Sequence, residues 1–195
     1  TPDPGFEALL PALDRKLPVA FAAQELREIR RVLAMAGEFT LDPIVVGGLE
    51  ADQAAAEIKA ASGRVIFSLN VPTRPRTLAP DADEPIRVLR QRANALKTPA
   101  ALAKAGVTFA FASGGLKDAK DFLTNARKAV QEGLAADAAV RALTIDAARI
   151  AGAADRTGSL EPGKIANVIV TSGDLFADGT SITHGGCAAR PGMAY

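Results

Sequence analysis

Few side chains in this sequence can act as nucleophiles, metal ligands or acid–base groups. The 195 residues include one cysteine, Cys187, and one histidine, His184. A single cysteine excludes a disulfide within the chain, and a single histidine excludes any site that needs two imidazoles from it. Both lie in a glycine-rich C-terminal stretch, which does not favour a Cys–His pair. The choice of catalytic chemistries is therefore narrow.

Two stretches nevertheless carry groups that can hold a ligand. The Ser113-Gly114-Gly115 turn follows an apolar run and precedes a helical pattern, so it predicts an anion-binding nest, a nucleophilic serine or simply a tight turn. No base is close to Ser113 in the sequence, which favours the turn. In the segment 70–83 three prolines exclude regular structure. Asn70 and Arg74 in that segment either contact a ligand or belong to a solvated loop.

Strand and helix patterns alternate along the first two thirds of the chain. Apolar runs rich in β-branched or aromatic residues predict strands at 18–21, 43–46, 64–69 and 107–111. None alternates with period two, so we expect strands buried on both faces, as in parallel sheets. Helical patterns follow at 25–39, 50–61, 87–105 (interrupted near Thr98-Pro99) and 118–132.

Strand followed by helix, four times over, predicts right-handed βα units on a parallel sheet. Four such units are half of a TIM-type (β/α)8 barrel, which has about 250 residues when complete. An open, flavodoxin-like sheet is the alternative. A half-barrel has two free edges and an apolar inner face, so we expect either a missing N-terminal half or self-association.

The alternation of strand and helix patterns ends after this region. Two short helical patterns, 137–143 and 145–151, precede a Gly/Pro turn and one further strand, 166–171. The ordered set of short motifs from Arg141 to Val170 resembles the amidohydrolase superfamily, and among its members the imidazolonepropionases. These motifs read Ala142-Leu143-Thr144, Ala147-Ala148-Arg149, Gly152, Gly158-Ser159-Leu160, Pro162-Gly163-Lys164, Ala166 and Asn167.

The resemblance implies the C-terminal portion of such an enzyme. The fold class is then α/β, with parallel βα units forming the second half of the barrel, followed by part of a small β-domain. Residues 1–157 would be the partial barrel with its trailing helices, 158–183 the return segment of the β-domain, and 184–195 a disordered tail. The motifs themselves connect barrel and β-domain and carry no chemistry.

The resemblance also implies a divalent metal, zinc, at the carboxyl ends of the barrel strands. The ligand positions fall on Ala22, Gly47 and Gly114, whose side chains donate nothing to a metal. We therefore expect a portion of a hydrolase of cyclic amides or amides that is inactive by itself, or a non-catalytic pseudoenzyme that holds a small molecule or anion. For the latter, the candidate ligand-binding residues are Asn70, Arg74, Ser113, Gly114 and Gly115.

Composition limits the partners. Twenty-three basic and 22 acidic side chains leave a net charge of +1, which predicts no attraction to nucleic acid or to an acidic membrane surface. The sequence has no apolar run of transmembrane length, and the first ten residues do not resemble a signal peptide. We expect a soluble protein, and the compartment stays open between the cytoplasm and export with the signal removed.

Overall fold

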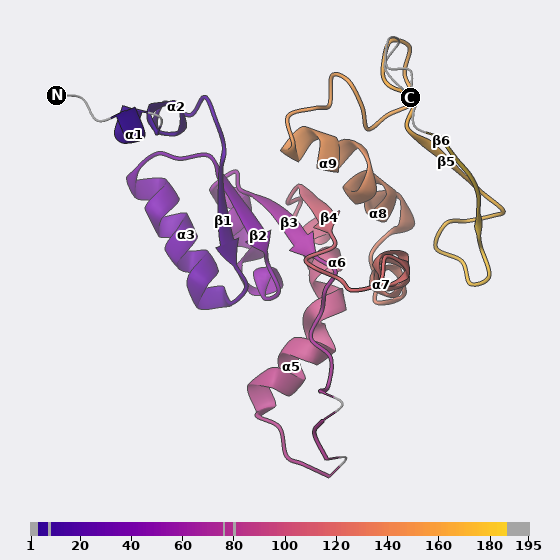
Figure 1. Ribbon diagram of the computed structural model, residues 1–195. Coiled ribbons are helices and arrows are strands. Elements are labelled where there is room, and N and C mark those ends of the chain that lie inside the picture. Colours follow the sequence, from indigo (N-terminus) through magenta and orange to yellow (C-terminus); the bar gives the residue numbers. More distant parts are fainter. Residues whose placement is uncertain (1–3, 8, 76, 80, 187–195) are drawn as a thin grey trace.

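The computed structural model describes residues 4–7, 9–75, 77–79 and 81–186, and its centre is a four-stranded parallel sheet (Figure 1). The strands lie in sequence order, each paired with the next. They are β1 (Val19–Ala23), β2 (Pro43–Gly47), β3 (Arg64–Ser68) and β4 (Phe109–Ala112). The predicted strands and their parallel arrangement are confirmed, and the sheet is consistent with part of a TIM barrel.

Helices separate the strands at the predicted places. The segment 50–61 begins as a 3-10 turn before it becomes α-helical, and the segment 87–105 breaks at residues 95–97, close to the expected interruption. The helices within and after the sheet are α3 (Leu26–Glu38), α4 (Ala55–Ala60), α5 (Ile86–Asn94), α6 (Thr98–Lys104), α7 (Lys120–Gln131), α8 (Ala136–Leu143) and α9 (Ile145–Ile150).

Local chemistry explains why α3 begins where it does. Glu25 and Glu28 form a capping box, in which the Glu28 carboxylate accepts the backbone N–H groups of Gln24 at 2.8 Å and of Glu25 at 3.1 Å. These two hydrogen bonds lower the pKa of Glu28. The buried side chains of the helix, Ile29 and Val32 among them, recur at helical spacing and face the sheet.

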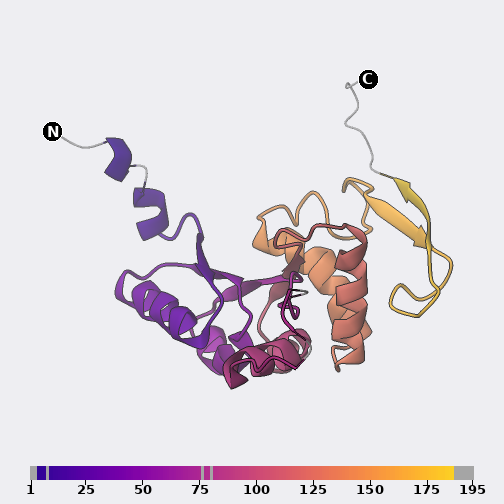
Figure 2. The same ribbon diagram turned by 60° about the horizontal axis from the view of Figure 1, so that its bottom comes forward.

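The outer face of the sheet carries the main core. Val45, Val65 and Phe67 are fully buried, and they pack in one cluster with side chains of α3, α4, α6 and α7. Figure 2 shows these helices along one side of the sheet. The Phe111 ring of β4 also meets two other rings edge to face. Its centroid lies 5.6 Å from that of Phe109 and 6.4 Å from that of Phe67.

The inner face of the sheet is covered in one place only within the described residues. A second, small cluster joins Ile44 and Ala110 to Ile150 of α9. Toward the carboxyl ends of the strands the cover stops, and Ala22 is exposed while Val46 and Ile66 are half-buried. The expectation that the strands are buried on both faces is therefore wrong for β1 and β3, whose inner-facing side chains are exposed or half-buried.

A hairpin follows the helices, formed by β5 (Val168–Thr171) and β6 (Ile182–Gly186), which pair antiparallel. We expected the tail to begin at residue 184, but β6 extends through Gly186 because its backbone pairs with Val168 at the start of β5. Residues 187–195, including Cys187, lie outside the described residues. Both strands are exposed, with Ile169 at 54% and Ile182 at 46% of full exposure.

Two short helices precede the sheet and were not predicted. They are α1 (Pro4–Glu7) and α2 (Leu10–Leu13), and they extend away from the body of the molecule (Figures 1 and 2). Large apolar side chains here, such as Phe6 at 72% and Leu10 at 52%, face solvent. Across the described parts of the chain, no helix has the length and apolar character needed to cross a membrane.

Candidate functional site

The carboxyl ends of the four parallel strands meet at one edge of the sheet, which we call the rim. Folds of this kind keep their sites at such an edge. The register aligns Ala23 with Gly47 and Ser68 with Ala112, so the ends of β1, β2, β3 and β4 lie in a continuous row. The structure thus places Ala22, Gly47 and Gly114 on the same rim.

The groups at the rim do not fit a divalent metal. A zinc site requires three or four nitrogen, sulfur or oxygen donors that converge on one point. The three positions that the resemblance assigns to ligands carry methyl groups or hydrogens, and the described residues contain no group of three or more His, Cys, Asp or Glu that could hold a metal ion.

Asn70 and Gly114 do come together at the rim. The Asn70 side-chain amide donates to the Gly114 carbonyl oxygen at 3.0 Å, and the Asn70 backbone N–H donates to the Ser68 hydroxyl oxygen at 3.2 Å. The end of β3 is thereby tied to the loop after β4. The Asn70 side chain thus links the two loops. A ligand contact by its side-chain amide oxygen stays a prediction.

Ser113, Gly114 and Gly115 form a turn. The Leu116 backbone N–H donates to the Ser113 carbonyl oxygen at 3.1 Å, and both glycines have positive φ, +58° and +82°. Helix α7 begins only at Lys120, so the turn does not lie at a helix N-terminus and gains nothing from a helix dipole. The start of α7 is held instead by Asp118, whose carboxylate accepts the Lys120 N–H at 2.9 Å.

Arg74 lies in the proline-rich loop and contacts other residues of this loop and Glu84, which follows it. Its guanidinium donates to the carbonyl oxygens of Ala79 at 2.7 Å and Ala82 at 3.2 Å, and to Glu84 at 2.6 Å. Arg92 of α5 donates to the same carboxylate at 2.6 Å. This ion-pair cluster, Arg74–Glu84–Arg92, folds the loop onto α5.

Glu84 is the acidic member of the cluster, and sequence reasoning missed it. Its side chain is only 6% exposed, and the hydrogen bond from Arg92, followed by the charges of both arginines, holds its pKa below the ordinary value. Nothing in the local sequence signals the pairing, because its partners are ten residues before it and eight after it. The cluster therefore ties the described part of the loop to α5.

A polar hollow of about 450 Å³ lies beside the rim, between α3 and α5. Several of its polar groups hold neighbouring elements together. Glu50 accepts the Leu26 backbone N–H at 2.9 Å and the Gln91 side-chain amide at 2.6 Å, and Arg87 pairs with Glu25 at 2.6 Å. These contacts are structural.

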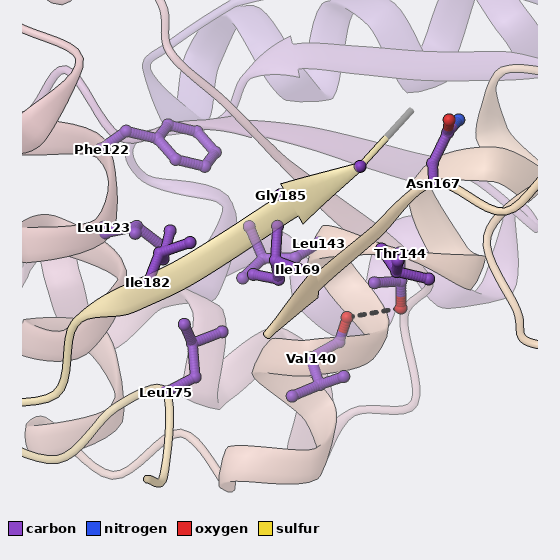
Figure 3. Close-up of a pocket in the computed structure, with 12 residues that line it drawn as sticks. Phe122, Leu123, Val140, Leu143, Thr144, Asn167, Ile169, Leu175, Ile182 and Gly185 are labelled. Carbon is purple, nitrogen blue, oxygen red and sulfur yellow. Dashed lines mark hydrogen bonds between the residues drawn. The ribbon is translucent and has the colours of Figure 1, made fainter. Parts of the chain in front are cut away.

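A largely apolar cavity of about 440 Å³ lies between the hairpin and the helices α7 and α8 (Figure 3). Ile182 and Ile169 of the hairpin face Phe122 of α7 and Leu143 of α8 across it. Thr144 is one of its few polar lining residues, and its hydroxyl is donated to the Val140 carbonyl oxygen at 2.7 Å. The lining has no ionisable side chain, so it offers apolar contact and no acid–base chemistry. The lining residues are Phe122, Leu123, Val140, Leu143, Thr144, Asn167, Val168, Ile169, Leu175, Ile182, Gly185 and Gly186.

The fold and the rim together define an α/β protein that forms part of a barrel. Its candidate site lies at the carboxyl ends of the strands, where barrels keep their sites. A family model described as the amidohydrolase family matches residues 5–189. The chain therefore belongs to the amidohydrolase family, as the motifs between Arg141 and Val170 indicated. A search of curated proteins finds no match.

Solved structures give the extent of the similarity. The chain resembles an amidohydrolase from Thermotoga maritima MSB8 with a TM-score of 0.77 and 25% identity, over 96% of this chain and 46% of the other. It also resembles a Xaa-Pro dipeptidase with methionine bound in the active site, with a TM-score of 0.64 and 20% identity, over 87% of this chain and 42% of the other. The second likeness concerns the fold alone. The chain spans less than half the length of each structure.

Proposed function

We propose that this chain provides the second half of a barrel that hydrolyses C–N bonds in cyclic amides or amides, and that it is inactive by itself. The observation that carries the proposal is the half-barrel: four parallel strands in order, an open inner face and a family match over residues 5–189. Because the rim supplies no metal ligand at Ala22, Gly47 or Gly114, the chain alone does not offer the metal-bound water that such a hydrolysis would use.

The missing contribution would come from a complementing half, which we define as a polypeptide segment that supplies the other four strands. Two features support such a partner. The edge strands of the sheet, β1 and β4, each pair with one neighbouring strand only. Exposed edges of parallel sheets are normally covered. The matched amidohydrolase is also more than twice as long as the part that this chain covers.

Metal content and hydrolysis test this proposal together. The purified chain is analysed for zinc, nickel and iron by elemental analysis, and assayed on a cyclic amide and on a dipeptide. We expect well under one metal ion per chain and no turnover. A stoichiometric metal that a chelator removes, with loss of hydrolysis, would contradict the proposed inactivity. Adding a complementing half should produce turnover, and no turnover after this addition would contradict the hydrolase assignment.

A second candidate is a non-catalytic binding domain that holds a small molecule or anion at the rim. The neutral polar set at this edge, with Asn70 beside Gly114 and the exposed Ser113, favours it. Thermal unfolding with and without inorganic phosphate provides the test, because a ligand of the folded state raises the melting temperature by mass action. Ser113→Ala should abolish any such shift, and Ser172→Ala, at an exposed serine of the hairpin region, should leave it unchanged.

A further inference from the structure

The three rim positions that lack metal ligands differ in the space around them. Ala22 is exposed, so a larger side chain there meets solvent. Gly47 and Gly114 both have positive φ, and a Cβ added to either would meet a neighbouring side chain. The nature of that neighbour decides whether a side chain can be accommodated.

At Gly47 the obstacle can move. A Cβ would lie 2.6 Å from the Gln24 Cδ, so the end of the Gln24 side chain occupies the space. Gln24 follows β1 directly and is exposed, and its amide lies at the end of a flexible side chain. Rotation about its χ angles clears the position at a small energetic cost.

At Gly114 the obstacle is fixed. A Cβ would overlap the Ser68 hydroxyl oxygen, would lie 2.8 Å from the Ser68 Cβ, and would lie 3.3 Å from the Asn70 Cβ. Ser68 has a short side chain on β3, an inner strand whose residues pair with β2 and β4. Rotation can move the hydroxyl, but only movement of the backbone can move the Cβ.

We propose that Ser68 keeps residue 114 a glycine, so that the rim between β3 and β4 is a structural seam of surface contacts rather than a ligand position that has merely lost its side chain. The seam consists of Ser68, Asn70 and Gly114, joined by the two hydrogen bonds of Asn70. A metal-ligating side chain at 114 therefore needs a second change at Ser68. This inference does not depend on whether the complete protein is a hydrolase.

Gly115 offers a matched control for the test. It is the next residue of the same turn, has a positive φ of +82°, and would place a Cβ with nothing within 4 Å. Gly114→Ala and Gly115→Ala thus share the backbone strain of a left-handed alanine, and only Gly114→Ala also meets Ser68. The difference between the two variants isolates the contact.

The experiment is a comparison of Gly114→Ala, Gly115→Ala, Ser68→Gly and the double variant Ser68→Gly/Gly114→Ala by urea unfolding of the full chain, followed by circular dichroism. We expect the unfolding equilibrium constant to rise about tenfold or more further in Gly114→Ala than in Gly115→Ala, because overpacking a fixed site is costly. In the Ser68→Gly background most of that extra loss should disappear.

Equal losses in the two alanine variants, or an undiminished loss in the double variant, would overturn the proposal. If Gly114→Ala does not fold, folding of the double variant supports it, and failure of the double variant while Ser68→Gly folds contradicts it. Hydrogen exchange gives a second readout: peptides covering residues 68–72 should exchange faster in Gly114→Ala than in Gly115→Ala. Equal exchange there also counts against the seam.

Discussion

The two faces of the central sheet differ in what they are built to contact. On the outer face Val45, Val65 and Phe67 are completely buried under helices of the same chain. On the inner face Ile150 of α9 packs with Ile44 and Ala110, whereas Ala22 remains exposed near the rim. Helices of the same chain cover the outer face, whereas the described residues leave part of the inner face uncovered.

This difference separates stability from function. Burial of apolar area is the main favourable term in folding, so the outer face determines whether the chain folds. The rim and the inner face determine with what it assembles and what it can bind. Substitutions on the two faces should therefore change different measured quantities, and the following predictions test this.

The largest effect is expected on the outer face, for Phe67→Ala. Removing a fully buried phenylalanine should lower the free energy of unfolding by about 3–5 kcal/mol. Ile66→Ala is the control, because the neighbouring side chain points to the half-buried inner face and should cost roughly 1 kcal/mol. Urea unfolding measures both, and equal losses would contradict the asymmetry.

A smaller loss is expected where α9 covers the inner face. Ile150 is 6% exposed and packs with Ile44 and Ala110, so Ile150→Ala should cost about 2 kcal/mol. Ile165→Ala, at a side chain that is 39% exposed, should cost about 0.5 kcal/mol or less. A neutral Ile150→Ala would show that α9 does not stabilise the sheet from this side.

The next effect is local and depends on pH. The pKa of Glu84 is lowered in the folded protein by Arg92 first and also by Arg74, so the ionised carboxylate favours the folded loop. This contribution is fully present above the ordinary glutamate pKa of about 4.3 and is lost as pH falls through the lower folded value. We expect the loop 70–85 to become sensitive to an acid-active protease in that range.

Glu84→Gln should make the same loop sensitive already at pH 5, because the charge on residue 84 is gone at every pH. Glu132→Gln, at an exposed glutamate at the end of α7, is the control and should leave the cleavage profile unchanged. Cleavage in the loop that is independent of pH in the unmodified chain would show that the ion-pair cluster does not hold it.

The smallest effect on stability is expected for Ala22→Asp on the open part of the inner face. The side chain is exposed, so the free energy of unfolding should change by about 0.5 kcal/mol or less. If this face contacts a complementing half or a second copy, the buried carboxylate should prevent the association. Light scattering and co-purification measure this, with Ala34→Asp on the exposed side of α3 as control. Unchanged association would show that the partner does not cover this face.

Much of the fold followed from the sequence because its signals are local. The apolar runs at 43–46 and 64–69 became β2 and β3 almost residue for residue, and the periodicity of 25–39 became α3. The motif set from Arg141 to Val170 indicated the family that the comparisons then showed. The two short helices before β1 escaped prediction because they bury few apolar side chains and leave no clear periodic stripe.

The site was predicted less completely, since its contacts join residues that are distant in the sequence. The sequence alone indicated the half-barrel class and the family, and it determined the absence of donor side chains at positions 22, 47 and 114. Only the tertiary structure decided that Ser68 lies against Gly114, 46 positions further along the chain, that Glu84 ties Arg74 to Arg92, and that one face of the sheet stays open. Periodicity reports how a segment is buried, whereas these contacts depend on strand register and on where loops return, and no local pattern encodes either.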